Sequence, residues 1–124
     1  MLVCDPAPDD GPVLVTVDYR VAPANVASFL EASTFLGRSR RRFGAFQWEM
    51  FRDAGAPNRF VETYMVESWG DHLRQHERVS VEQEVDEKRL RALLLPGVAP
   101  VVTHLVAARA GDDEDAEEGA RERT

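Results

Sequence analysis

Cysteine is nearly absent from this sequence, and long apolar runs are absent altogether. Cys4 is the only cysteine among 124 residues, so no disulfide can form within one chain and a reducing compartment is expected. No apolar run approaches the roughly 20 residues that a membrane-spanning helix needs. The start of the chain is too short and too acidic for a signal peptide. These features predict a cytoplasmic protein that does not insert into a membrane.

The sequence also lacks an excess of positive charge. The formal net charge is -7, and most of the acidic excess lies in residues 1–12 and 111–124, which leaves the middle of the chain close to neutral. A near-neutral domain with acidic ends argues against nucleic acid and against an anionic membrane surface as partners.

Composition divides the chain into three parts. Residues 1–11 are rich in Asp, Pro and Gly, and residues 111–124 are dominated by acidic side chains. Such segments cannot bury enough apolar surface to become ordered. We therefore expect a flexible head, a disordered acidic tail and, between them, one domain at residues 12–110 that is long enough to form a single hydrophobic core.

Hydrophobic periodicity within this domain alternates between the strand and helix types. Strands are predicted at residues 13–21, 45–53, 59–68 and 98–108, and helices at residues 23–43, 69–79 and 81–94. The order is β-α-β-β-α-β, with the short helix at 69–79 before the second main helix. It predicts a ferredoxin-like α+β fold, in which a four-stranded antiparallel sheet carries its helices on one face.

The pattern also assigns side chains to faces. Phe46, Trp48 and Met50 alternate along the second strand and are expected to share one face. Ser80 is the expected cap of the last helix, with Val85 and Leu90 among its apolar positions.

Both faces of the predicted sheet carry apolar side chains. Leu14, Phe51 and Val61, for example, alternate with residues that are themselves apolar or large. An antiparallel sheet with one wet face usually alternates more cleanly. The simplest cover for the second face is another copy of the chain, which predicts a homodimer; a monomer with scattered exposed apolar residues is the alternative.

Several segments resemble a known domain. They are residues 40–45 (RRRFGA), Trp48, residues 59–62 (RFVE) and residues 67–78 (ESWGDHLRQHER). Together they resemble the domain that follows the last membrane helix of bacterial major-facilitator exporters of the transmembrane secretion effector group. That domain is similar to the antibiotic biosynthesis monooxygenase family of dimeric α+β barrels, and the similarity runs from about residue 13 to residue 108. Because the chain begins with Met1, it is expected to be a free-standing relative or a detached exporter domain.

The resemblance also implies a site. In the monooxygenase family, substrates lie between the sheet and the helices and meet a strand Trp or Tyr, an Asn or Arg, and a helical His. Trp48 and Tyr64 match the strand positions by location. His76, with His72 second, matches the helical position, and Asn25 is the nearest candidate for the family Asn.

The two helical histidines leave three interpretations open. His72 and His76 are spaced i, i+4 and would share one helix face. They could act in acid–base catalysis, bind a metal or haem iron with His104 or Glu62 as a further ligand, or be polar surface residues. Nothing fits the His-Glu-x-x-His signature. We expect no metal and no cofactor.

Other candidate residues have two interpretations each. The aromatic and apolar residues Phe46, Trp48 and Met50 could stack a ligand or pack in the core, and Trp69 could contact a ligand or anchor the strand-to-helix junction. Glu62, between apolar neighbours, needs a cationic partner, and Arg74, Arg78 and Arg42 are the candidates. The cluster of Arg residues at 38–42 is expected to be solvated.

The sequence thus favours a homodimer that binds an apolar aromatic or polyketide-like metabolite and acts in bacterial secondary metabolism. The chemistry would be cofactor-free oxygenation or an acid–base cyclisation or isomerisation. His76 would transfer protons, Tyr64 would hydrogen-bond a developing enolate, and Arg74 or Arg42 would stabilise its charge. The alternative is a non-catalytic accessory or dimerisation module of a major-facilitator exporter.

Overall fold

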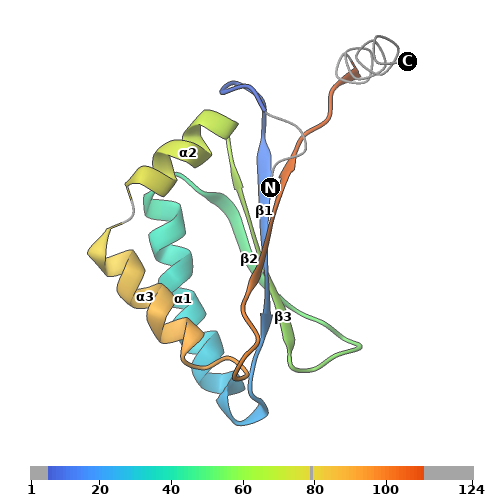
Figure 1. The fold of residues 1–124 in the computed structure, drawn as a ribbon, viewed down its shortest axis with the longest axis vertical. Coiled ribbons are helices and arrows are strands. Elements are labelled where there is room, and N and C mark those ends of the chain that lie inside the picture. Colours follow the sequence, from blue (N-terminus) through green and yellow to red (C-terminus); the bar gives the residue numbers. More distant parts are fainter. Residues whose placement is uncertain (1–5, 79, 111–124) are drawn as a thin grey trace.

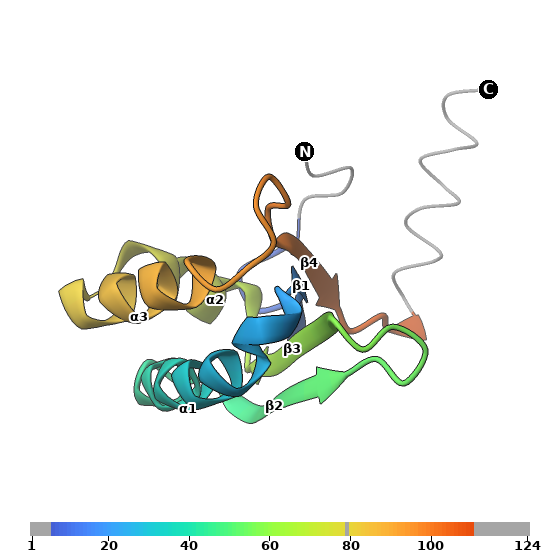
Figure 2. The same ribbon diagram turned by 90° about the horizontal axis from the view of Figure 1, so that it is seen from below.

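A computed structural model of the chain describes residues 6–78 and 80–110 (Figure 1). The strands and helices, in chain order, are β1 (Val13–Arg20), the 3₁₀ turn η1 (Pro23–Asn25), α1 (Val26–Arg42), β2 (Phe46–Arg52), β3 (Arg59–Val66), α2 (Trp69–Glu77), α3 (Val81–Arg91) and β4 (Val101–Val106). The strands form one antiparallel sheet in the order β2-β3-β1-β4. Figure 2 shows the three helices on one side of this sheet. The predicted ferredoxin-like α+β fold is confirmed.

Local signals in the sequence explain where the helices begin. Pro23 lies in the 3₁₀ turn that leads into α1, where its fixed φ suits a helix start. The Ser68 and Ser80 side chains accept hydrogen bonds from the Asp71 and Gln83 backbone N–H groups at the N-termini of α2 and α3. The expected Ser80 cap is therefore confirmed.

The last strand is shorter than its pattern indicates. β4 begins at Val101 rather than at residue 98. Pro100 comes directly before it and has no N–H to donate to a strand ladder. None of the described helices is long and apolar enough to cross a membrane.

The core lies between the sheet and the helices. Alternate residues of β1 and β3 point toward the helices and are buried, as Val15 and Phe60 are. Phe29 and Leu36 of α1 and Leu90 of α3 pack against them and are almost fully buried. Val85 does not join this core: 52% of it is exposed. The prediction for Val85 was wrong because the side of α3 that faces the sheet carries Leu90, and Val85 lies on the opposite side of the helix.

A β-bulge near the start of β2 changes which of its residues face the helices. Gln47 has a φ of 51°, and the β2–β3 register shifts between Phe46 and Glu49. The extra residue breaks the period-two alternation. Phe46 therefore pairs with Met65 on the outer face, whereas Trp48 packs against the core. The prediction that Phe46 shares a face with Trp48 and Met50 was wrong for Phe46.

The outer face of the sheet carries exposed or half-buried apolar side chains on all four strands. Phe51 is 54% exposed and Val101 is 62% exposed. The apolar residues of this face, called here the outer apolar face, are Leu14, Phe46, Phe51, Val61, Met65, Val101 and Leu105.

Candidate functional site

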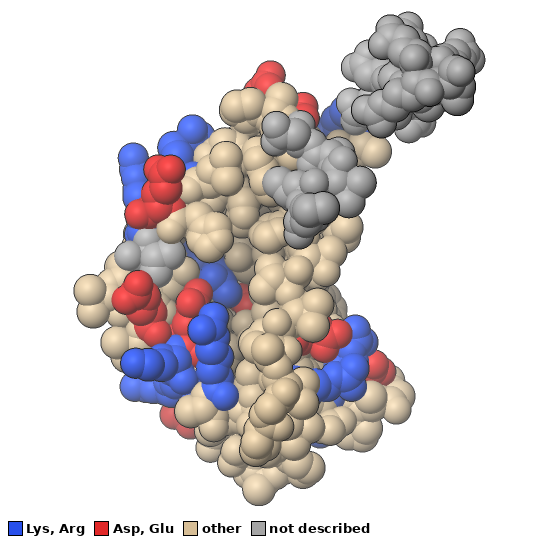
Figure 3. Space-filling model, in the orientation of Figure 1, with Lys and Arg blue, Asp and Glu red and all other residues tan. Residues whose placement is uncertain are grey.

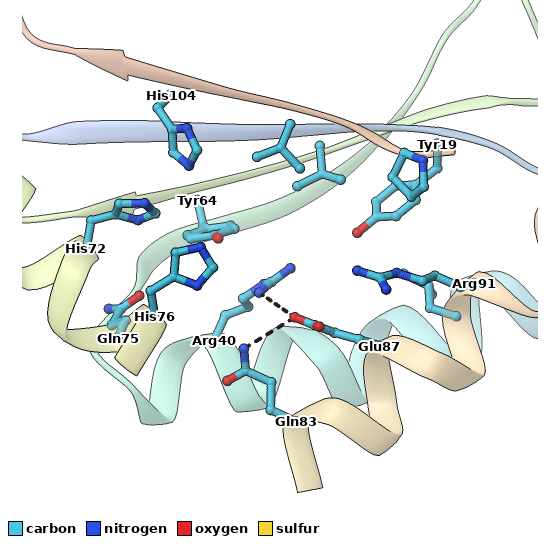
Figure 4. Close-up of a pocket in the computed structure, with 14 residues that line it drawn as sticks. Tyr19, Arg40, Tyr64, His72, Gln75, His76, Gln83, Glu87, Arg91 and His104 are labelled. Atoms are coloured by element: carbon cyan, nitrogen blue, oxygen red, sulfur yellow. Dashed lines mark hydrogen bonds and ion pairs between the residues drawn. The ribbon is translucent and has the colours of Figure 1, made fainter. Parts of the chain in front are cut away.

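A cavity of about 300 Å³ lies between the sheet and helices α2 and α3 (Figure 4). Such a volume is at the lower end of the range for small-molecule sites, about 300–1,000 Å³. The residues that line it are Val17, Tyr19, Arg40, Tyr64, His72, Gln75, His76, Gln83, Glu87, Leu90, Arg91, Pro100, Val102 and His104. The wall thus combines an apolar part with two polar ends.

Histidines form one end of the cavity. His72 and His76 come from α2 and His104 from β4, and the rings of His72 and His104 are 4.5 Å apart, centroid to centroid. The His76 ring lies 5.7 Å from that of His72, and the Trp69 indole packs against both His72 and His104. The i, i+4 spacing places His72 and His76 together, and the pairing of β4 with β1 adds His104.

Two of these imidazoles are neutral at pH 7. Burial, the charge of His104 and the charge of His76 together lower the pKa of His72 to about 4. Burial and the nearby His76 also lower the pKa of His104. A neutral imidazole has one N–H donor and one acceptor nitrogen, so each ring can exchange a proton with a ligand.

Tyr64 lines the cavity beside Arg40 and has a hydroxyl that no other described residue pairs with. The residue is 6% exposed, and its hydroxyl makes no hydrogen bond within residues 6–78 and 80–110. In this described part, every side-chain polar atom that is out of reach of solvent has a partner, so the hydroxyl is accessible from the cavity. Burial raises the pKa of Tyr64, which keeps the hydroxyl protonated and able to donate.

A buried carboxylate lies behind the cavity wall. Glu62 is fully buried and accepts hydrogen bonds from the Tyr19 hydroxyl at 2.8 Å, from Arg40 Nε at 3.0 Å and from Trp48 Nε1 at 2.8 Å. Burial lowers the pKa of Arg40, but the attraction of Glu62 outweighs it and raises the pKa overall, so Arg40 is a permanent cation. The Arg40 guanidinium also lies over the Tyr64 ring, 4.8 Å from its centroid.

The sequence prediction of the Glu62 partner was therefore wrong. Glu62 pairs with Arg40, because Arg40 is on the face of α1 that packs against β3. The expectation that all the arginines at 38–42 are solvated fails for Arg40, whose side chain is 12% exposed. The i, i+4 spacing of Leu36 and Arg40 on the buried face of α1 was the signal that could have identified it.

The remaining predicted arginines lie outside the cavity. Arg74 pairs with Asp71, and Arg42 pairs with Glu82 at 2.7 Å. Both border a separate, open depression that Arg78 also lines. They do not reach the space that Tyr64 and His76 share.

The predicted stacking residues do not line the cavity either. Trp48 packs against Gly37 of α1 and hydrogen-bonds Glu62, Met50 is half-buried against the core, and Phe46 lies on the outer face. Trp69 is buried against the histidines, as expected for an anchor.

The structure therefore brings together Tyr64, His72 and His76 from the predicted set. It adds cavity residues that sequence reasoning missed, namely Tyr19, Arg40, Gln83, Glu87 and Arg91. Within the described residues, no group of three or more His, Cys, Asp or Glu side chains is arranged to hold a metal ion.

Comparison with known families agrees with this architecture. Residues 2–111 match the family described as transmembrane secretion effector. The chain belongs to the transmembrane secretion effector family. None of the curated proteins matches its sequence.

The fold of this member of the secretion effector family is similar to solved structures from a second group of proteins. A Caulobacter crescentus protein proposed to be an antibiotic biosynthesis monooxygenase aligns with a TM-score of 0.68 at 16% identity, covering 82% of this chain and 94% of its own. A Nitrosomonas europaea protein proposed to have the same role aligns with a TM-score of 0.67 at 14% identity, covering 82% of this chain and 94% of its own. A third such protein, from Deinococcus radiodurans, aligns with a TM-score of 0.65 at 15% identity, covering 79% of this chain and 94% of its own. At these identities the likeness shows a shared fold, and the resemblance stated above is confirmed.

Proposed function

We propose that this protein is a cytoplasmic homodimer that binds a mostly apolar, aromatic or polyketide-like metabolite in the cavity and transforms it by proton transfer without a cofactor. One possible outcome is cyclisation or isomerisation through an enolate. The other is oxygenation by dioxygen, in which an activated CH₂ becomes C=O, one oxygen atom enters the product and the other leaves as water with the two hydrogens.

One observation carries this proposal: two polar side chains face the cavity without a hydrogen-bond partner among the described residues. Tyr64 and His72 are 6% and 7% exposed, and neither makes a side-chain hydrogen bond with another described residue. Because every side-chain polar atom of the described residues that is out of reach of solvent has a partner, the polar atoms of these two residues are open to the cavity. A ligand in the cavity can therefore pair with them.

The same groups are suited to proton transfer. His76, at the cavity edge, or the neutral His72 would accept a proton from an activated carbon, and the Tyr64 hydroxyl would donate a hydrogen bond to the developing enolate oxygen. Arg40 takes over the charge-stabilising role expected of Arg74 or Arg42, because it lines the cavity beside Tyr64.

The outer apolar face supports the homodimer. Monomeric proteins rarely expose contiguous apolar patches larger than a few hundred Å². Here the apolar side chains extend over all four strands, from Phe51 on β2 to Val101 on β4. A second copy would bury this face and leave the cavity, on the opposite side of the sheet, free for a ligand.

Solvent deuterium exchange tests the chemistry without knowledge of the natural substrate. The probe is 2-tetralone, a bicyclic ketone with an acidic CH₂, and NMR follows the exchange of its α-hydrogens in D₂O. His76→Ala and Tyr64→Phe should each lower the protein-catalysed rate by about 10²-fold or more and leave the fold intact by circular dichroism. The matched control is Arg74→Gln, which removes a charge outside the cavity and should retain the wild-type rate.

If both cavity variants retain the full rate, the catalytic assignment is wrong. A second candidate function is then favoured by the family match over residues 2–111: a non-catalytic accessory or dimerisation module that works with a major-facilitator exporter. That function predicts a stable dimer that neither binds apolar probes nor accelerates exchange.

A further inference from the structure

Two guanidinium groups face each other at the end of the cavity away from the histidines. Arg40 reaches this end from α1 and Arg91 reaches it from α3. Figure 4 shows their charged groups pointing toward one another, with the Tyr19 hydroxyl close to the gap between them. Like charges that face each other repel, and in this arrangement Glu62 and Glu87 compensate the charge of Arg40 but not that of Arg91.

The two arginines retain free hydrogen-bond donors. Arg40 makes two hydrogen bonds to Glu62 and one to Glu87, and a guanidinium has five N–H donors. Arg91 makes no ion pair and no hydrogen bond through its side chain in residues 6–78 and 80–110. An anion between the two groups would satisfy these donors and remove the repulsion.

Glu87 does not supply that anion. It lies one helical turn before Arg91, but its carboxylate accepts from Arg40 Nη1 at 3.2 Å and from Gln83 Nε2 at 3.4 Å and makes no ion pair with Arg91. Glu62 is equally engaged, with Arg40, Tyr19 and Trp48 as donors. The cation without a counter-charge at this site is Arg91.

The part of the cavity between its two ends is apolar. Val17, Leu90 and Val102 line it. The Tyr64 ring lies next to Arg40, 4.8 Å from its guanidinium, and the histidines form the far end. A ligand that matches both ends has an acidic group, a flat apolar body and a second polar group at the opposite end. Planar guanidinium groups fit a carboxylate in particular, because they can donate two parallel hydrogen bonds to it.

We propose that the cavity selects organic acids, and that the ligand carboxylate binds between Arg40 and Arg91 while the apolar body extends past Tyr64 toward the histidines. This inference rests on the proposed function only in that the same cavity must hold the ligand. It makes Arg91 the residue that determines specificity for acids.

Calorimetric titration with two matched probes tests the inference. The probes are 2-naphthoate and its uncharged amide, 2-naphthamide. Arg91→Gln should weaken naphthoate binding about tenfold, equivalent to about 1.4 kcal/mol, and leave naphthamide binding unchanged. Arg89→Gln is the control, since Arg89 lies two residues away on α3 but contacts Phe35 and does not line the cavity.

The outcomes separate this inference from the proposed function. If both probes bind and Arg91→Gln affects them equally, the acid selectivity is wrong and the ligand cavity stands. If neither probe binds to any form of the protein at millimolar concentration, both the acid subsite and the ligand cavity are wrong. Arg91 is the last residue of α3 and is exposed, so its variant should fold, and a thermal melt checks this.

Discussion

Trp48 and Glu62 are joined across strands β2 and β3 by a hydrogen bond of 2.8 Å from the indole Nε1 to the carboxylate. This contact makes the indole part of the scaffold of the cavity, because Glu62 also holds Arg40, which lines it. The space-filling view in Figure 3 shows acidic and basic side chains interspersed on the helical side of the molecule. The Glu62–Arg40 pair, by contrast, is largely removed from solvent.

The buried carboxylate should be essential to stability. Glu62→Gln removes the more deeply buried of the two carboxylates that pair with Arg40 but retains the shape of the side chain, and breaking a buried pair in this way costs about 3–5 kcal/mol. Urea unfolding should show this loss. Glu31→Gln, at an exposed position of α1, should change the free energy of unfolding by less than about 0.5 kcal/mol. A loss below about 1 kcal/mol for Glu62→Gln would mean that the network contributes little.

Replacing Gly37 by alanine should not give the gain in stability that replacing a helical glycine usually gives. Gly→Ala within a helix normally stabilises by about 1 kcal/mol. At Gly37, however, an added Cβ would lie 2.8 Å from Trp48 Cδ2 and 2.9 Å from Cε2. We expect Gly37→Ala to lower the free energy of unfolding by about 1–3 kcal/mol. Ser28→Ala, at an exposed position of the same helix, should be neutral or slightly stabilising, and a stabilised Gly37→Ala variant would contradict the observed Trp48 packing.

The histidine end of the cavity should make stability depend on pH. The pKa of His72 is lowered to about 4 in the folded protein, from about 6.5 in an unfolded chain. The unfolded state therefore binds more protons between these two values. The stability that neutral His72 contributes is fully present above pH 6.5 and is lost as the pH falls through 4.

The measurement is the free energy of unfolding of wild type and His72→Phe as a function of pH. Phe retains a flat ring against Trp69 but cannot titrate, and His104 and the carboxylates are common to both proteins. As the pH falls from 7 to 4, wild type should lose more stability than His72→Phe. The free energy of unfolding of wild type minus that of the variant should therefore decrease. Parallel curves would show that His72 titrates at its ordinary pKa.

The outer apolar face should mediate dimerisation. Phe51→Glu and Leu105→Glu each place one charge per subunit on this face, and a desolvated, unpaired charge opposes association. In sedimentation velocity at micromolar concentration, wild type should run as a dimer and both variants as monomers. Phe35→Glu is the control, since Phe35 is similarly exposed but lies on α1, on the other side of the sheet. A wild-type monomer at that concentration would exclude the homodimer.

Local sequence signals were sufficient for the order of the elements. The alternation in β1, the i, i+7 spacing of Phe29 and Leu36 in α1, and the Ser80 cap depend only on residues close together in the sequence. The histidine pair also came from spacing, since residues at i and i+4 always lie on one helix face. This spacing identified the cavity residues His72 and His76, whereas Tyr64 was implied by the resemblance to the monooxygenase family.

The partners of the polar groups were decided by tertiary structure alone. One extra residue at the Gln47 bulge moved Phe46 to the opposite face of the sheet, and no alternation pattern reveals such a shift. The choice of Arg40 over the neighbouring Arg42 as the Glu62 partner depends on which side of α1 meets β3, and the entry of His104 beside His72 depends on the pairing of β4 with β1. Hydrophobic periodicity can be read from the sequence because it depends only on residues that are close together in the chain. Contacts between distant residues depend on how whole helices and strands pack.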